Sequence, residues 1–208
     1  DKTVVQKFRR KFHYKGPIKV TTFGPIGNDG YLYRSKISRK VNLDMDKVRL
    51  LHVGAIYGSK RKLISLAKSV EEIRGFTLDV IGPSRNEEVG DNLLEISRKS
   101  EGIKFVNQFI ELSEIDQLKT SDIFVVPNIS GGVPTGIYLA STYKLPIIAF
   151  EQTIAGEIVK REGIGVSLSR GFSTKRIKKS CLSIRDRRDN IIKRQEKFLE
   201  RHNWKRAA

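Results

Sequence analysis

Short apolar runs alternate with stretches in which every third or fourth residue is apolar, from Lys47 to Leu168. Val48 to Val53 is one such run and ends at Gly54, whereas Leu63 to Ile73 carries apolar side chains at a helical spacing. Apolar strands that alternate with helices of about ten residues are typical of a parallel sheet covered on both faces. The pattern therefore predicts an α/β fold with a doubly wound parallel sheet.

The same alternation predicts each element along the chain. The expected strands are 48–53, 77–81, 103–106, 123–127, 146–150 and 165–168, and the expected helices are 63–73, 87–100, 112–119, 135–143 and 154–161. Residues 173–205 are expected to form a long basic helix, continuous or broken, which docks on the domain through its apolar positions. Ligands of doubly wound sheets bind beyond the carboxyl ends of the strands, so the residues after each strand are the candidates for a site.

The first 46 residues lack the regular pattern of strands and helices. Residues 1–46 show weak periodicity and contain several glycine and proline breakers, among them Gly16-Pro17 and Gly24-Pro25. We assign residues 1–46 to a linker or N-terminal appendage and residues 47–208 to the α/β domain. The chain begins at Asp1 rather than at Met and has no signal-peptide pattern, so we expect it to be part of a longer protein.

The net charge of the chain indicates anionic binding partners but does not identify one class of them. The 208 residues include 40 Lys and Arg against 23 Asp and Glu, a formal net charge of +17, and much of the excess lies in 7–15 and 170–206. Such a charge attracts polyanions, anionic membrane surfaces and phosphorylated ligands. Nucleic acid is not the expected partner, because the basic C-terminal helix lacks interleaved aromatic residues and no nucleic-acid-binding motif is present.

Several other classes of protein are excluded or receive no support. No apolar run approaches the roughly 20 residues that cross a bilayer. The single cysteine, Cys181, cannot form an internal disulfide, and His13, His52 and His202 lack the spacing of metal ligands. We expect His52 to be a satisfied core histidine, and Asp122 to cap a turn or helix rather than act as an acid catalyst.

The stretch from Pro127 to Phe150 carries the clearest chemical signal. It contains a strand, a glycine-rich turn from Ser130 to Gly136, a helix and a second strand. The glycines allow close backbone approach, and the helix that starts near Thr135 directs its free N–H groups at the turn, which favours a diphosphate. The alternative is that the glycines only make a tight turn between strand and helix.

Pro127, Gly132, Pro134, Ala140 and the run Leu145 to Ala149 also follow a known family pattern. In these positions the chain resembles the signature of the C-terminal domain of retaining glycosyltransferases of the GT-B fold, family 4 or group 1. The resemblance extends over most of the chain from Lys47. It implies a Rossmann-like domain that forms one half of a GT-B fold and binds a nucleotide-diphosphate sugar, such as a UDP- or GDP-sugar, without a metal or other cofactor.

The resemblance also implies a set of nucleotide-sugar-binding residues. These are Gly54, Lys60, Arg61, Gly82, Pro83, Phe109, Gly131, Gly132, Val133, Pro134, Thr135, Gly136 and Tyr138. Lys60 and Arg61 would neutralise the leaving diphosphate together with the helix N-terminus, or would be a solvated basic pair at a helix start. The side chain of Tyr138 would stack on the ligand or pack in the domain.

Two departures from the family pattern leave the function open. The two signature glutamates would fall on Gly131 and Leu139, and an arginine after the first strand would fall on Ala55. The chain is either the donor-binding domain of a transferase or a non-catalytic relative that binds a partner. In the first case a further N-terminal domain or a partner subunit would bind the glycan, lipid or protein acceptor. We expect a cytoplasmic protein whose basic flanks face an anionic membrane surface.

Overall fold

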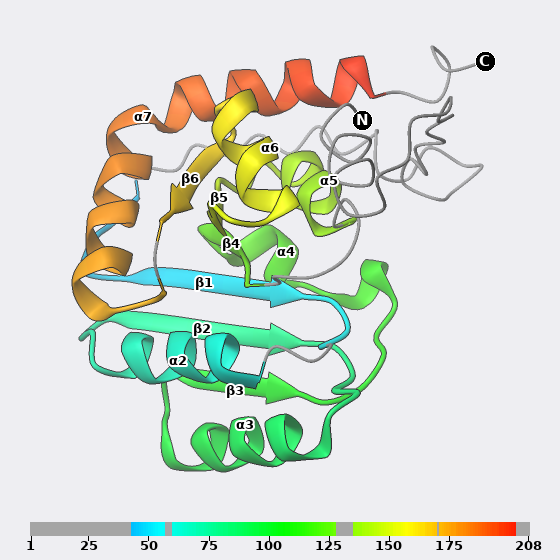
Figure 1. Ribbon diagram of the computed structural model, residues 1–208, viewed down its shortest axis with the longest axis vertical. Coiled ribbons are helices and arrows are strands. Elements are labelled where there is room, and N and C mark those ends of the chain that lie inside the picture. The colour runs from blue at the N-terminus through cyan, green and yellow to red at the C-terminus, as the bar shows by residue number, and fades with distance from the viewer. Residues whose placement is uncertain (1–42, 57–59, 128–134, 170, 203–208) are drawn as a thin grey trace, which may run out of the picture.

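The computed structural model describes residues 43–56, 60–127, 135–169 and 171–202 (Figure 1). These residues form a six-stranded sheet in which every neighbouring pair of strands is parallel. The strands are β1 (Val48–Val53), β2 (Phe76–Ile81), β3 (Ile103–Val106), β4 (Ile123–Val126), β5 (Ile147–Phe150) and β6 (Gly165–Leu168). The predicted fold class is confirmed, and each predicted strand lies within one residue of its observed bounds.

The order of the strands across the sheet is β3-β2-β1-β4-β5-β6. The chain therefore builds one half of the sheet outward from β1 and the other half outward from β4. The boundary between β1 and β4 is the topological switch point, where loops after adjacent strands leave in opposite directions and open a crevice. We call the edge at which the strands end the carboxyl edge and the opposite edge the amino edge.

Helices cover both faces of this sheet (Figure 1). One face is covered by α2 (Lys60–Glu71), α3 (Glu87–Lys99) and the first half of α7 (Thr174–Arg201), and the other by α4 (Gln117–Thr120), α5 (Thr135–Thr142) and α6 (Ile154–Glu162). Strands β4 and β5 are apolar and buried along both faces. Strands β1, β2 and β3 are buried on the face that packs against α2 and α3, and their other face carries the polar residues Arg49, Asp79 and Lys104.

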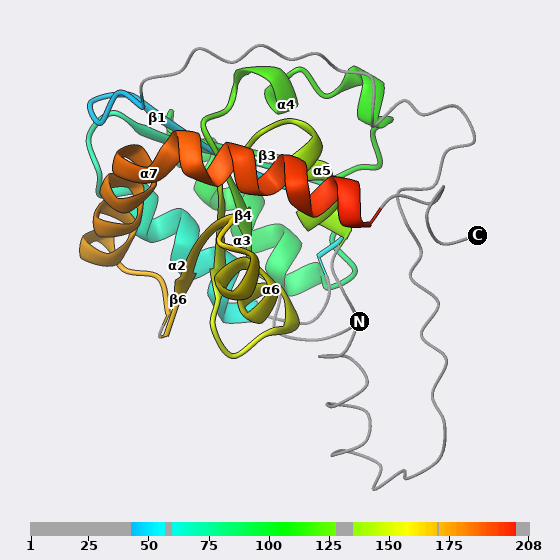
Figure 2. The same cartoon turned by 90° about the horizontal axis from the view of Figure 1, so that it is seen from above.

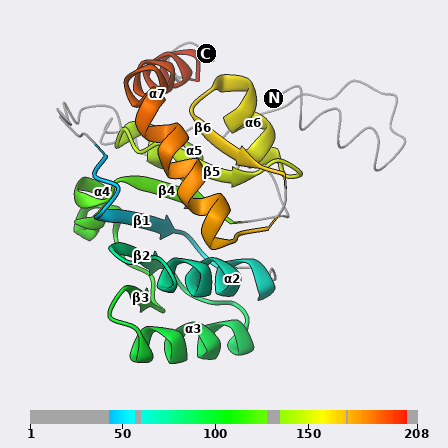
Figure 3. The same cartoon turned by 90° about the vertical axis from the view of Figure 1, so that its left-hand side faces the viewer.

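The long C-terminal helix is continuous but changes direction. Its first half lies beside α2 and β6, and its second half lies against α5 and α6 (Figures 2 and 3). At the turn between them the buried Arg188 donates from Nη1 to the carbonyl oxygen of Asp122 at 3.5 Å, and Gln195 donates to the carbonyl oxygen of Leu145 at 2.6 Å. Asp122 and Leu145 precede β4 and β5, so α7 wraps around the amino edge of the sheet.

The predicted helix 112–119 is wrong in form. The chain instead makes a short 3-10 helix η1 (Leu112–Glu114), a non-helical residue at Ile115, and the single turn of α4. Ile115 and Leu118 are buried in the core, whereas Leu112 is exposed. The helix is broken at the buried Ile115, whose φ of −89° and ψ of 86° are not helical, so tertiary packing overrides the local periodicity here.

Asp122 and His52 both have structural contacts. The Oδ2 atom of Asp122 accepts a hydrogen bond from the backbone N–H of Arg49 at 2.8 Å, so it joins the starts of β1 and β4 as a cap. The Nδ1 atom of His52 lies 3.0 Å from the carbonyl oxygen of Val125. The Nε2 atom of His52 is buried without a hydrogen-bond partner among the described atoms, and burial lowers the pKa of this imidazole. His52 is therefore a core histidine as predicted, but only one of its ring nitrogens is satisfied.

Candidate functional site

The loops after β1 and β2 approach each other through their glycines at the carboxyl edge. Gly54 and Gly82 have φ angles of 144° and 143°, in the region that favours glycine. A Cβ atom on Gly82 would lie 2.3 Å from the carbonyl oxygen of Gly54, whereas one on Gly54 would meet nothing within 4 Å. Gly82 thus allows the two loops to touch, and the space beside Gly54 is left open.

Backbone hydrogen bonds extend this contact beyond the strands. The N–H of Ile56 donates to the carbonyl oxygen of Pro83 at 3.0 Å, and the N–H of Arg85 donates to that of Ile56 at 3.1 Å. The N–H of Ser84 donates to Oδ1 of Asn107, the first residue after β3, at 2.7 Å. The loops after β1, β2 and β3 therefore form one fixed border along the crevice. The sequence interpretation missed Asn107, although an amide directly after a buried strand is a readable signal.

The predicted basic pair begins the helix that follows this border. Lys60 and Arg61 are the first two residues of α2, directly after the segment that follows β1, and their side chains lie outside the described part. Phe109 lies in the loop after β3 and is 76% exposed. Thr135 begins α5 on the other side of the switch point and is also exposed. The fold thus brings these four positions to the carboxyl edge.

The described part of the glycine-rich segment has a packing role. A Cβ atom on Gly136 would lie 3.1 Å from Cε1 of Phe124, so this glycine lets α5 pack closely on β4. Gly131, Gly132, Val133 and Pro134 lie outside the described residues, and their predicted contact with phosphates stays a prediction.

Tyr138 and Leu139 on α5 both point into the protein. The ring centroid of Tyr138 lies 5.3 Å from that of Phe198 and 5.9 Å from that of His202, both on or at the end of α7. Tyr138 was expected either to stack on the ligand or to pack in the domain, and in the structure it packs in the domain. Leu139, where the second family glutamate would fall, is 7% exposed and belongs to the same buried cluster. Leucine therefore contributes to the core at this position.

A basic residue that the sequence interpretation passed over lies at the carboxyl edge. Lys62, the third residue of α2, places its Nζ atom 3.8 Å from the ring centroid of Phe150, the last residue of β5. The ring of Phe172 packs on Phe150 with a centroid distance of 4.6 Å. Burial lowers the pKa of the Lys62 ammonium. The run Lys60 to Lys62 was visible in the sequence, but the contact of Lys62 with β5 was not.

A separate hollow lies far from this edge. Its volume is about 400 Å³, and it is lined by Leu43 and residues 185–190 of α7. Arg188 in its lining contacts the residue before β4, so the hollow lies at the amino edge and is not a nucleotide site of the kind that this fold forms. Among the described residues no group of three or more His, Cys, Asp or Glu side chains is placed to hold a metal ion.

The all-parallel order β3-β2-β1-β4-β5-β6, with helices between the strands and a switch point between β1 and β4, defines a Rossmann-like domain. The sequence profile described as "Glycosyl transferases group 1" matches residues 47–176, and the chain belongs to this family. A search of curated protein sequences gives no match.

Several solved structures share this fold, among them WaaG, a glycosyltransferase, and a domain of a group 1 glycosyl transferase. HepE of Anabaena, solved in complex with UDP, superposes with a TM-score of 0.58 and 14% identity over 75% of this chain and 44% of its own. The C-terminal domain of the group 1 protein LpcC from Francisella tularensis gives 0.55 and 14% identity, over 78% of this chain and 92% of that domain. WaaG, a glycosyltransferase involved in lipopolysaccharide biosynthesis, superposes with a TM-score of 0.53 and 17% identity over 74% of this chain and 42% of its own. The chain thus matches less than half the length of WaaG and of HepE, and its fold is that of one GT-B half.

Proposed function

We propose that this chain is the donor-binding domain of a glycosyltransferase that uses a nucleotide-diphosphate sugar. The observation that carries the proposal is the open space beside Gly54, directly after β1 at the switch point, where Gly82 lets the neighbouring loop approach the backbone of Gly54. A ligand approaches backbone closely only where side chains are absent, and doubly wound sheets bind nucleotides at this crevice. Membership of the group 1 family and the UDP-bound structure of HepE support the choice of ligand.

The residues around the crevice have separate roles in this proposal. Lys60 and Arg61 face the diphosphate and neutralise the charge that develops when the sugar leaves. Thr135 and Gly136 begin α5, whose first N–H groups bind phosphate oxygens in the same step. The exposed ring of Phe109 lies at the edge as a surface for the base. No metal or other cofactor has a role in this scheme.

Nucleotide titration tests the donor site directly. UDP, GDP and ADP are titrated into the 208-residue protein, followed by amide chemical shifts and by thermal melting. We expect one of the three to shift amides after β1, β2 and β4 and to raise the melting temperature. Uridine, guanosine and adenosine are the matched controls that lack phosphate. No response to any diphosphate would remove the proposal.

A non-catalytic role is the second candidate, and the burial of Leu139 favours it. A core leucine stands where the family pattern has a glutamate, so one signature carboxylate has no counterpart in α5. In this case the domain binds a nucleotide sugar or a partner subunit without transferring the sugar. The assay is donor hydrolysis by the longest native form of the protein, compared with the variants Gly131→Glu and Gly131→Glu with Leu139→Glu. Hydrolysis by the natural sequence would exclude this candidate.

We also propose that the protein acts at an anionic membrane surface on the cytoplasmic side, where its acceptor would be bound by another domain or subunit. The first half of α7 supports this, because Lys175, Lys178 and Lys179 are exposed and no acidic residue lies between Thr174 and Arg185. In the described part of the chain, no helix combines the length and apolar character that a membrane span requires. Co-sedimentation with vesicles of neutral lipid, with and without 30% anionic lipid as roughly the content of a charged leaflet, tests the idea.

A further inference from the structure

Lys62 lies at the junction of the two halves of the sheet. It belongs to α2, which follows β1, yet its ammonium contacts the ring of Phe150 at the end of β5. In the sheet β4 lies between β1 and β5. Val126, the last residue of β4, pairs with Ala149, so Phe150 stands one residue beyond the end of β4. The side chain of Lys62 therefore reaches from α2 to the carboxyl end of β5, across the position of β4 in the sheet.

The ammonium of Lys62 is held on an apolar support instead of by a carboxylate. Phe150 is 1% exposed, and its ring packs against that of Phe172 with a centroid distance of 4.6 Å. Among the described residues Lys62 has no acidic partner. Other cations of the domain, such as Lys99 with Glu95 and Lys144 with Glu196, have one.

A partly desolvated cation without an anionic partner binds an incoming oxyanion more strongly than a fully hydrated lysine does. A charge-assisted hydrogen bond to an oxyanion is stronger than a solvent-exposed cation–π contact, so a ligand oxygen would draw the ammonium from the ring. The flexible stem of lysine permits this movement while α2 stays in place.

We propose that Lys62 is an anion-binding residue of the donor site, which contacts a phosphate oxygen or an acidic group on the donor sugar. The inference rests on the proposed function and adds to it a third cation, whose ammonium lies at the end of β5. The ammonium of Lys62 already rests on an aromatic ring before the ligand arrives.

The test compares two lysines of the same helix. Lys62→Met removes the cation, Lys62→Arg keeps it, and Lys68→Met makes the same charge change on the exposed last turn of α2. Calorimetric titration should give a Kd about tenfold weaker for Lys62→Met with the ligand that carries the contacted anion, either the responding nucleoside diphosphate or its glucuronic acid conjugate. Lys68→Met should match the wild type, and Lys62→Arg should recover most of the affinity. A Kd for Lys62→Met within twofold of that for Lys68→Met, for every ligand tried, would overturn the proposal.

Different ligands separate the two sources of the anion. If Lys62 contacts a phosphate, Lys62→Met weakens the binding of the nucleoside diphosphate and of its glucose conjugate equally. If Lys62 contacts the sugar, the loss appears with the glucuronic acid conjugate and not with the diphosphate or the glucose conjugate. Either pattern supports the proposal and assigns the contact.

The experiment can show separately whether the proposed donor-binding function is wrong and whether the proposed role of Lys62 is wrong. If the wild type binds no nucleotide, the proposed function is wrong, and inorganic pyrophosphate becomes the probe for Lys62. Weaker pyrophosphate binding by Lys62→Met than by Lys68→Met would support the proposed anion site. If the wild type binds no pyrophosphate either, the anion site is wrong as well.

Discussion

Gly54 and Gly82 occupy equivalent positions after neighbouring strands, but only one of them is surrounded by backbone. Gly82→Ala should lower the free energy of unfolding by about 3 kcal/mol, because it combines a strained positive φ with a contact to the carbonyl oxygen of Gly54. Gly54→Ala carries only the strain, about 1 kcal/mol. Urea denaturation of both variants measures the difference. Equal losses would show that the contact between the two loops adds nothing.

His52 should make the stability of the domain depend on pH. Burial lowers the pKa of His52 in the folded protein below its unfolded value of roughly 6.5. The unfolded chain therefore binds more protons below that pH, so the contribution is fully present above about pH 6.5 and falls by up to about 1.4 kcal/mol for each pH unit below it. Denaturant unfolding between pH 5 and pH 8 measures this slope. His52→Gln should flatten the slope, and an unchanged slope in this variant would contradict the assignment.

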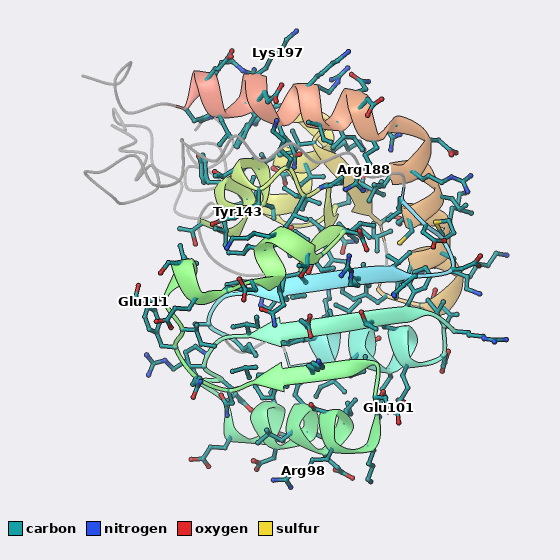
Figure 4. All side chains as sticks on the ribbon, turned by 180° about the vertical axis from the view of Figure 1, so that it is seen from behind. Arg98, Glu101, Glu111, Tyr143, Arg188 and Lys197 are labelled. Atoms are coloured by element: carbon teal, nitrogen blue, oxygen red, sulfur yellow. The ribbon has the colours of Figure 1, made fainter. Side chains whose placement is uncertain are left out.

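At the scale of elements, α7 depends on contacts with the strand starts. Gln195 is 0% exposed and donates to the carbonyl oxygen of Leu145 at 2.6 Å. Gln195→Leu leaves this buried carbonyl without its donor and should cost about 2 kcal/mol of stability. Lys197→Ala is the matched control on the same half of α7, because Lys197 is exposed and points outward (Figure 4). It should change the free energy of unfolding by less than about 0.5 kcal/mol. Equal effects of the two variants would show that this hydrogen bond does not hold α7.

The elements differ in how well the sequence predicts them, and the reason is where their side chains pack. The strands were predictable because each is a short, mostly apolar run: β4 and β5 are buried on both faces, and β1, β2 and β3 on at least one. The helix expected at 112–119 was not, since Ile115 and Leu118 enter the core from separate short turns. In the site, the glycines and the basic run were visible as residue types. The contact of Lys62 with Phe150 joins residues from β5 and α2, and no local pattern encodes it.

At the scale of the whole molecule, the sequence places the start of the domain at Lys47, and the packing of Leu43 makes that boundary testable. Leu43 is 3% exposed and belongs to the same cluster as α2 and the first half of α7, with Met45 packed against that cluster. A chain that starts at Leu43 retains these contacts, whereas a chain that starts at Lys47 loses them. Deletion of a buried leucine side chain costs about 2 to 5 kcal/mol, so the shorter chain should be less stable by at least about 2 kcal/mol.

Urea unfolding of the two truncated chains, together with nucleotide titration of each, measures this difference. We expect both to bind the responding diphosphate, because Gly54, Gly82 and the start of α5 are present in each, and only the shorter one to unfold at lower urea. Leu43→Ala in the longer chain is the matched control and should reproduce most of the loss. Equal stability of the two chains would place the start of the folding unit at Lys47, and loss of binding in both would mean that residues 1–42 take part in the site.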